Sequence, residues 1–425
     1  MSPQRGDRLT IEIESLAVGG RGVARHSSQN GRLVIFVNDV TPQDVVEVEL
    51  TKVKKNFAEA RLVKVLHPSP FRRLPECSVA GVCGGCSWQH VEYAEQLRQK
   101  RVIVEQALRR MSGFNLDEGF VEPVVPSPRE FRYRNRIQLQ HQPGTKDHKQ
   151  SPATASKKAE MGFFKRGSHQ IVDIEDCLIT EEIITREIPR LKTSLVDTPP
   201  GRVELLVDQS GHFAVRKGEP DNSADYRTDD STDDCTDDHT NDSHASAFSQ
   251  VNTLQNQALV EFVVNTIKNL MTNTASVSTI YDLYAGNGNF TFPLAQTVNK
   301  SRILAVELNQ ESVLQARQKN AQVGANIEFQ QADVGEFLRK LPAKALAKSI
   351  VLLDPPRTGC EPDVILALAD GSPAFLVYVS CHPVTLARDL KPLKNAGFEL
   401  LRVLPFDMFP QTDHVESVAV LKRSH

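Results

Sequence analysis

The feature that most constrains the fold is a regular alternation of strand-like and helix-like segments in the C-terminal part of the chain. An apolar pattern with helical spacing covers 256–271. Short apolar segments of strand type follow at 278–285, 302–308, 326–333, 349–354 and 375–380. Strands that alternate with helices form parallel sheets covered by helices on both faces. Residues 248–425 are therefore predicted to form a doubly wound, Rossmann-like α/β domain.

The N-terminal part has a different pattern. Residues 8–66 alternate apolar and polar side chains, and Gly- or Pro-containing breaks separate the segments. Several short strands in such a length predict a small antiparallel barrel of the OB type. One break carries Arg21 and Arg25 beside its glycines. A basic barrel face is typical of RNA binding, but small barrels also serve as structural modules, so the pattern leaves both roles open.

The middle of the chain changes composition several times. A Pro-containing linker at 68–76 precedes a helical pattern at 91–113 and strand-rich segments in 131–220, which a polar insertion at 141–160 interrupts. An acidic, low-complexity stretch then covers 221–246 and is predicted to be disordered. The predicted divisions are a barrel at 1–67, a central β-rich domain at 68–220, an acidic insertion at 221–247 and the α/β domain at 248–425.

The charge is unevenly distributed. The chain carries a net charge of −3, but residues 221–244 contain nine Asp and one Arg, which gives −8 and leaves +5 for the rest. This surplus permits a polyanionic partner. The chain has no apolar run of about 18 residues, and its first residues lack the apolar core of a secretory signal. We therefore expect a cytoplasmic protein with no membrane segment.

A glycine-rich turn, Asp282-Leu-Tyr-Ala-Gly-Asn-Gly-Asn-Phe290, joins a predicted strand to a helix. Its glycines allow a ligand to approach the backbone, although the spacing differs from that of dinucleotide-binding turns. Glu307 ends the next predicted strand, where a carboxylate can accept hydrogen bonds from a ribose, and Asp333 ends the one after it, near where an adenine would lie. This arrangement predicts a site for S-adenosylmethionine.

Two further strand ends carry reactive groups. One ends in Asp354-Pro-Pro-Arg357, and the absence of an aromatic residue after the prolines disfavours methylation of an exocyclic amine. The other ends in Ser380-Cys381-His382-Pro383. A single cysteine is often a small buried apolar residue, but its place before a helix predicts a nucleophile whose thiol pKa is lowered by the helix N-terminus.

A polar segment, Asp407 to Glu416, precedes the last apolar strand. Glu416 can be an ordinary carboxylate at a strand edge and His414 a surface residue. Beside Cys381, these groups would instead supply a proton acceptor for a nucleophile.

Several of these motifs together resemble the RNA uracil-C5 methyltransferase family. They are FSQVN at 248–252, DLYAGNGNF, DPPR, YVSCHPVTLARDL and DMFPQTDHVES, in this order. The N-terminal barrel resembles the TRAM domain of that family, and the whole chain resembles its 23S ribosomal RNA branch. Departures are the two polar insertions, Ala285 where some members have Cys, and His382 where Asn or Asp is common; neither position is the nucleophile.

The resemblance implies a class I methyltransferase fold and a covalent mechanism. Cys381 would add to carbon 6 of uracil, carbon 5 would take the methyl group, and Glu416 would remove the carbon 5 proton. By family position, the residues that contact S-adenosylmethionine would be Gln250, Tyr284, Asn289, Glu307, Asp333 and Asp354. The target uridine must leave its stack to be reached.

Four cysteines form a candidate metal site. Cys77, Cys83 and Cys86 lie within ten residues, with Gly84 and Gly85 between the last two, and Cys177 supplies a fourth thiolate. Spacing alone does not distinguish zinc from an iron–sulfur cluster. The family resemblance implies a 4Fe–4S cluster at these positions in the central domain, with zinc as the alternative. No role is assigned to Cys235 or Cys360.

The resemblance thus implies a monomeric enzyme that forms 5-methyluridine in 23S ribosomal RNA. One alternative keeps this chemistry and changes the substrate to the T-loop of transfer RNA or to another ribosomal uridine. Another alternative is an RNA-binding assembly factor without catalysis, which the intact Cys381, Glu416 and cofactor turn disfavour.

Overall fold

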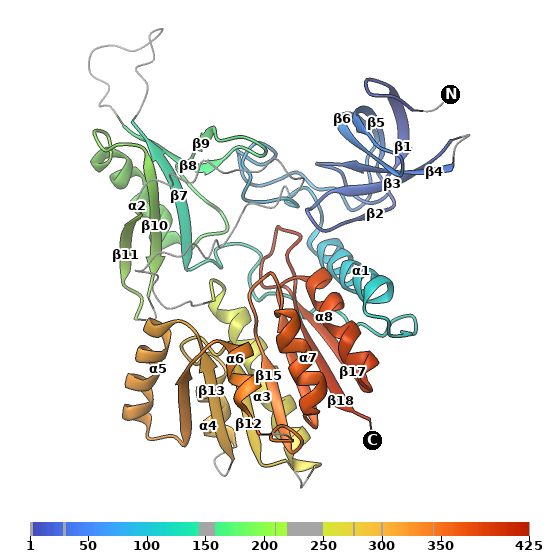
Figure 1. Cartoon of the computed structure of the whole chain (residues 1–425). Coiled ribbons are helices and arrows are strands. Elements are labelled where there is room, and N and C mark those ends of the chain that lie inside the picture. Colours follow the sequence, from blue (N-terminus) through green and yellow to red (C-terminus); the bar gives the residue numbers. More distant parts are fainter. Residues whose placement is uncertain are drawn as a thin grey trace.

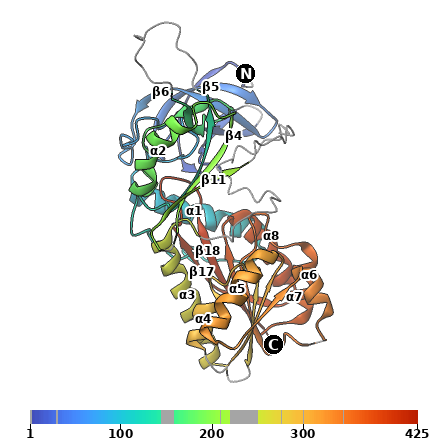
Figure 2. The same ribbon diagram turned by 90° about the vertical axis from the view of Figure 1, so that its left-hand side faces the viewer.

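The chain builds three β-sheets that follow one another along the sequence (Figure 1). The structure, a computed structural model, describes residues 3–28, 31–143, 158–208, 210–218, 250–274, 277–298, 301–342 and 344–424. The predicted acidic insertion at 221–247, most of the polar insertion at 141–160 and Cys235 lie outside these residues. Figure 2 shows that the first two sheets both lie on the same side of the third.

The first sheet is a strongly curved barrel of six strands in the described residues, with the order β1-β5-β6-β4-β3-β2. The strands are β1 Arg8–Glu12, β2 Ser15–Leu16, β3 Gly22–Ser28, β4 Gly31–Val37, β5 Val45–Val53 and β6 Phe57–His67. Alternate side chains point inward and form a core around Ile35, Val46 and Val48, as the alternation of apolar residues predicts.

The second sheet has the order β11-β10-β7-β8-β9. Its strands are β7 Arg136–Gln142, β8 Glu160–Phe164, β9 Ile171–Asp173, β10 Gly201–Val207 and β11 Phe213–Gly218. Sequence reasoning treated this region as strand-rich and missed α2 (Glu182–Ser194), whose Ile184 and Ile188 pack into the sheet core. The strand expected from residue 131 begins only at Arg136.

The third sheet has the order β14-β13-β12-β15-β16-β18-β17, and its first five strands are parallel. The strands are β12 Thr279–Leu283, β13 Arg302–Glu307, β14 Ile327–Gln331, β15 Ser349–Leu353, β16 Phe375–Ser380, β17 Phe398–Phe406 and β18 Glu416–Arg423. The helices are α3 Thr253–Thr272, α4 Thr291–Thr297, α5 Gln310–Val323, α6 Val334–Lys340, α7 Pro362–Gly371 and α8 Pro383–Asn395. The predicted doubly wound sheet is therefore present.

The hydrophobic core of this domain lies on both faces of the sheet. One cluster joins β15, β16, α7 and α8, and another joins α3 to the opposite face. Every residue of β15 and β16 is buried, which explains their unbroken apolar sequences. The chain leaves each parallel strand at the same edge, and the candidate site residues stand at that edge.

One long helix connects the parts. Helix α1 (Tyr93–Met111) follows the barrel and linker, and its Val104 and Leu108 belong to the same core cluster as Leu386 and Leu390 of α8. In Figure 1 it lies beside α8, below the barrel. No helix among the described residues has the length and apolar character that crossing a membrane requires.

Candidate active site

The glycine-rich turn after β12 has a backbone that only small or specially held residues adopt. Tyr284, Gly286 and Gly288 have φ values of 63°, 55° and 90°. A Cβ at Gly288 would approach the Phe292 ring to 2.6 Å. Positive φ at the two glycines and this close approach explain why the turn needs them. At Gly286, by contrast, the space where a Cβ would lie is open.

Glu307, the last residue of β13, is fixed beside this turn. Its two carboxylate oxygens accept hydrogen bonds from the backbone N–H groups of Gly286, at 2.8 Å, and Asn309, at 2.7 Å. Leu308 follows with its side chain 64% exposed, although it is large and apolar. Asp333, which was predicted to end a strand, instead caps α6 two residues after β14 ends at Gln331, and it accepts from the N–H of Glu336 at 2.9 Å. A carboxylate and an exposed apolar side chain therefore stand side by side at this strand end.

Of three other predicted cofactor residues, Tyr284 and Asn289 belong to the turn itself, and Gln250 precedes α3. Asn289 exchanges two amide hydrogen bonds with Asn256 of α3, at 2.9 and 3.1 Å. The Tyr284 hydroxyl is hydrogen-bonded to the sulfur of Cys360, so this buried cysteine supports the turn. Gln250 is half-buried, and its carbonyl oxygen accepts from the side chain of Asn135 at 3.2 Å.

Cys381 and Glu416 lie opposite each other although 35 residues separate them in sequence. Ser380, the last residue of β16, pairs with Ser417 of β18 in an antiparallel ladder. Cys381 follows this pair and Glu416 precedes it, so the two residues face each other across the strand ends. Directly opposed residues have Cβ atoms about 5 Å apart. The predicted nucleophile and proton acceptor are therefore brought together.

The electrostatic setting of the thiol differs from the prediction. Burial, followed by the Glu416 carboxylate, raises the pKa of Cys381, while the Arg357 guanidinium opposes this shift. The predicted lowering of the thiol pKa by the helix N-terminus is therefore wrong for the protein without ligands. The sequence does not show that the thiol is buried, which is the largest cause of the shift, or that a carboxylate from a distant segment lies beside it.

The carboxyl groups of the site also hold their protons tightly. Burial raises the pKa of Glu416 to about 7, although Arg357 opposes the shift. Burial, with the charges of Glu416 and Asp282, raises the pKa of Asp354 well above its usual range. Burial raises the pKa of Asp282 to about 7, although a hydrogen bond from Thr291 opposes this. The charges of Glu416 and Asp282 thus both disfavour ionisation of Asp354.

Arg357 is the cation that these groups share. Its charge acts on the pKa of Cys381, His382, His414 and Glu416. The backbone around it is held by α8: Thr385 donates to the Arg357 carbonyl oxygen at 3.2 Å. Sequence reasoning used this arginine to disfavour amine chemistry and gave it no place in the site.

The loop that joins β17 to β18, residues 407–415, is held in place by contacts with distant parts of the chain. Lys100 of α1, fully buried, forms an ion pair with Asp407 and donates to the Phe409 carbonyl oxygen at 2.9 Å. Gln96 of α1 accepts from the Gln411 N–H at 3.0 Å. These anchors were missed because no local pattern shows that a lysine and a glutamine are buried.

The same loop also contacts the barrel and the cysteine-containing loop. Asp413 accepts from the backbone N–H of Gly19 at 2.8 Å and from the Ser87 hydroxyl at 3.0 Å. Trp88 is fully buried and donates through its backbone to the Gln411 carbonyl oxygen at 2.9 Å. Residues from every part of the fold therefore meet at the segment that leads to Glu416.

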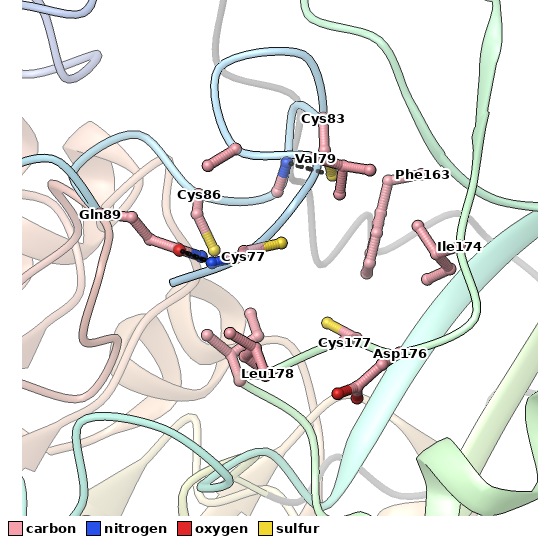
Figure 3. Close-up of a pocket in the computed structure, with 13 residues that line it drawn as sticks. Cys77, Val79, Cys83, Cys86, Gln89, Phe163, Ile174, Asp176, Cys177 and Leu178 are labelled. Carbon is pink, nitrogen blue, oxygen red and sulfur yellow. Dashed lines mark hydrogen bonds between the residues drawn. The ribbon is translucent and has the colours of Figure 1, made fainter. Parts of the chain in front are cut away.

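The four predicted metal-binding cysteines line one cavity (Figure 3). Cys77, Cys83 and Cys86 come from the loop after the linker, and Cys177 comes from the segment between β9 and α2. Phe163 and Ile174 give the cavity apolar walls. Within the part of the chain that the structure describes, no three His, Cys, Asp or Glu side chains converge closely enough to hold a single metal ion.

Comparison with known proteins adds two family matches. The family described as tRNA (uracil-5-)-methyltransferase matches residues 236–424, and the TRAM domain matches residues 3–63. An uncharacterized RNA methyltransferase of Bdellovibrio bacteriovorus is 39% identical, over 99% of this chain and 96% of its own length.

Two further similar proteins have names that state a substrate. The 23S rRNA (uracil(1939)-C(5))-methyltransferase of Salmonella typhimurium is 31% identical over 98% of this chain and 96% of its own length. The crystal structure of Pyrococcus abyssi tRNA (uracil-54, C5)-methyltransferase, in complex with S-adenosyl-L-homocysteine, has a TM-score of 0.66 and 25% identity. The superposition covers 97% of this chain and 100% of the archaeal chain.

Proposed function

Because the chain belongs to the family of S-adenosylmethionine-dependent RNA uracil-C5 methyltransferases, we propose that it methylates carbon 5 of a uridine in 23S ribosomal RNA through a covalent bond to Cys381. The observation that carries the mechanism is the facing pair of Cys381 and Glu416 at the ends of β16 and β18. In this arrangement a nucleophile and a proton acceptor can both reach one planar base.

The chemistry needs both groups because carbon 5 of uracil is a weak nucleophile. The Cys381 thiolate adds to carbon 6, and the electron pair of the carbon 5–carbon 6 bond becomes available at carbon 5. Carbon 5 then forms a bond to the methyl group, and the sulfonium keeps the electrons of the broken bond. Glu416 takes the proton from carbon 5, and the bond to Cys381 breaks with return of the thiolate.

S-adenosylmethionine would supply the electrophilic methyl group. The residues present fit it: Gly286 has open space where a Cβ would lie, and Glu307 is oriented by two N–H groups toward the same strand end. The exposed Leu308 gives an adenine an apolar surface. In this proposal, Asp333 lies near the adenine, while Gln250, Tyr284, Asn289 and Asp354 border the rest of the cofactor.

A 4Fe–4S cluster bound by Cys77, Cys83, Cys86 and Cys177 is part of the proposal. Four thiols around one apolar cavity match its donor set, and the same donor set suits zinc, which stays the alternative. The Gly85 N–H donates to the Cys83 sulfur at 3.4 Å, which is a contact that stabilises thiolate ligands. The cluster would hold two distant segments together, since methyl transfer requires no electrons.

The choice of 23S rRNA rests on the 31% identical relative, whose name states that substrate and whose sequence aligns over nearly all of this chain. The alternative, the T-loop of transfer RNA, has support from the similar archaeal structure. That structure also spans the barrel and the central sheet, so domain content does not separate the two substrates. Another ribosomal uridine is a further alternative.

The experiment that tests the proposal uses protein purified without oxygen, labelled S-adenosylmethionine and separate 23S and transfer RNA transcripts. Nucleoside analysis should find label in 5-methyluridine from 23S RNA. Label from transfer RNA alone would keep the roles of Cys381 and Glu416 and move the substrate. No 5-methyluridine from either RNA would favour a binding protein without catalysis.

A further inference from the structure

His414 lies in the site beside Glu416, and the proposed mechanism gives it no role. Val415 separates the two residues and is buried in the core beneath β18. Successive side chains of an extended chain point to opposite faces, so His414 and Glu416 share the face away from this core. The charge of Arg357 acts on both residues, which places them around the same guanidinium group.

The contact with Arg357 determines which nitrogen of His414 carries the proton. The guanidinium Nη2 lies 2.8 Å from His414 Nδ1. A guanidinium group donates hydrogen bonds and has no acceptor, so Nδ1 accepts and the proton of the neutral ring is on Nε2. The Phe409 ring meets the imidazole edge to face at 5.8 Å and fixes the ring plane.

The imidazole is neutral under ordinary conditions. Burial lowers the pKa of His414 to about 4; the Asp413 carboxylate opposes the shift, and nearby cations support it. Those cations are Arg357, Lys100 and Arg134. Among the described residues, no group accepts a hydrogen bond from Nε2. A neutral ring with a defined tautomer therefore presents an unused N–H donor beside the proton acceptor.

The proposed addition of Cys381 creates a charge that such a donor can stabilise. When the thiolate bonds to carbon 6, the displaced electron pair is delocalised over carbon 5, carbon 4 and oxygen O4, so O4 becomes an enolate oxygen. A donor that is already oriented toward such an oxygen lowers the barrier without reorganisation. A neutral imidazole is suited to this task because it polarises a carbonyl without adding a further positive charge.

We propose that the Nε2–H of His414 donates a hydrogen bond to O4 of the target uracil and stabilises the enolate formed when Cys381 adds to carbon 6. This rests on the proposed function. It assigns His414 a catalytic contact with the substrate and Arg357 the positioning of that contact. Carbon 5 faces Glu416 while the neighbouring carbonyl faces His414, as the shared face of the two side chains requires.

Two substitutions separate this role from a structural one. His414→Gln keeps an N–H donor near the position of Nε2, whereas His414→Asn keeps a polar atom near Nδ1, toward Arg357, and loses the donor to the substrate. We expect kcat of His414→Asn to fall about 10²–10³-fold with little change in KM, the range for loss of one such donor. His414→Gln should retain about a tenth or more of the wild-type kcat.

The reverse order, with His414→Asn active and His414→Gln inactive, would show that the histidine only orients Arg357 and would overturn the proposal. Equal losses in both variants, with unchanged melting temperature and unchanged S-adenosylmethionine affinity, would overturn it as well. A wild-type protein that forms no 5-methyluridine would instead overturn the proposed function, and this proposal with it.

Modified RNA identifies the oxygen. Sulfur is a weak hydrogen-bond acceptor, so an RNA with 4-thiouridine at the target should slow the wild-type enzyme and slow His414→Asn no further. The matched control, 2-thiouridine, should reduce both enzymes by the same factor. If 4-thiouridine slows His414→Asn by the same factor as it slows the wild-type enzyme, His414 does not contact O4. The same conclusion follows if only 2-thiouridine slows the wild-type enzyme.

Discussion

The carboxylate of Asp413 accepts a hydrogen bond from the backbone N–H of Gly19, at 2.8 Å, although 394 residues separate them along the chain. The bond joins a turn of the N-terminal barrel to the loop that ends at Glu416. The second oxygen accepts from Ser87, which follows the cysteines of the proposed cluster site. The active-site loop is therefore supported by parts of the chain that perform no chemistry themselves.

Replacing Asp413 by alanine should lower both stability and turnover. The substitution leaves the Gly19 N–H and the Ser87 hydroxyl without their acceptor, which costs about 1–3 kcal/mol for a buried group. The free energy of unfolding, from urea titration, and the methylation rate should both decrease. Asp117→Ala, at an exposed position, serves as the control and should change neither. A stable Asp413→Ala protein with normal turnover would contradict the supporting role of this contact.

Substitution of Glu416 by glutamine should arrest the reaction after the methyl group has been transferred. Without its proton acceptor the methylated adduct cannot release Cys381, and turnover should fall about 10²–10⁴-fold. A covalent protein–RNA species should then accumulate and remain on a denaturing gel. The double variant Cys381→Ala, Glu416→Gln provides the control, since it has no nucleophile. A band of equal strength in the double variant would exclude Cys381 as the attachment site.

The reactivity of the Cys381 thiol should respond in opposite directions to its two charged neighbours. Glu416 raises the thiol pKa and Arg357 lowers it. The pH midpoint of Cys381 alkylation, followed by mass spectrometry of the cysteine peptide, should therefore fall in Glu416→Gln and rise in Arg357→Leu. Midpoints that move the same way in both variants would contradict the arrangement of charges around the thiol.

The raised pKa of Glu416 also predicts how its contribution to stability changes with pH. Its pKa is about 7 in the folded protein against an ordinary value of 4.5, so the folded state binds this proton more tightly than the unfolded state. The contribution is therefore most favourable below about pH 4.5, decreases as the pH rises to about 7, and is constant above. The difference in unfolding free energy between wild type and Glu416→Gln should follow this course. A difference that is independent of pH would contradict it.

Cys177→Ala should remove the proposed iron–sulfur cluster. Cys177 comes from a different segment than the other three cysteines, so its loss should separate the two walls of the cavity. Visible absorption and iron content of anaerobically purified protein should drop, and the melting temperature should fall with them. Cys381→Ala provides the matched control, because that cysteine lies outside the cavity. Wild-type protein that binds zinc and no iron under these conditions would support the alternative metal.

The pattern of apolar residues predicted those helices and strands whose own sequence is sufficient to determine them. The six residues of β16 were predicted as they stand, because an unbroken apolar run has a stable place only inside a covered parallel sheet. Helix α2 was missed because its sequence contains adjacent β-branched residues and an internal proline, Pro189, and its helicity depends on packing against β10. Strand β17 was not predicted for a similar reason, because its pairing partner is β18, which follows it in the sequence.

The positions of the site residues could be predicted where residue type and strand ends were sufficient, while their roles stay predictions. Sequence reasoning placed Cys381, Glu416 and Glu307 at one edge of the sheet, which the structure shows. It failed for the thiol pKa, since the burial of Cys381, which is the larger cause, and the nearby charge of Glu416 both arise only once the strands have paired and packed. It also gave no sign of Lys100, whose burial depends on an ion pair 307 residues away. Long-range contacts decide these properties, and no window of sequence contains them.

The anchoring of loop 407–415 has a consequence for how the protein is made. The ribosome makes Lys100 307 residues before Asp407 and Gln96 315 residues before Gln411, so both side chains wait through that length of synthesis for the partners that bury them. A nascent chain that ends before Asp407 lacks the carboxylate that pairs with Lys100, a side chain that is fully buried in the folded protein. Such a chain also lacks Glu416 and the loop that leads to it. The proposed proton acceptor therefore joins the site only when this loop docks on α1.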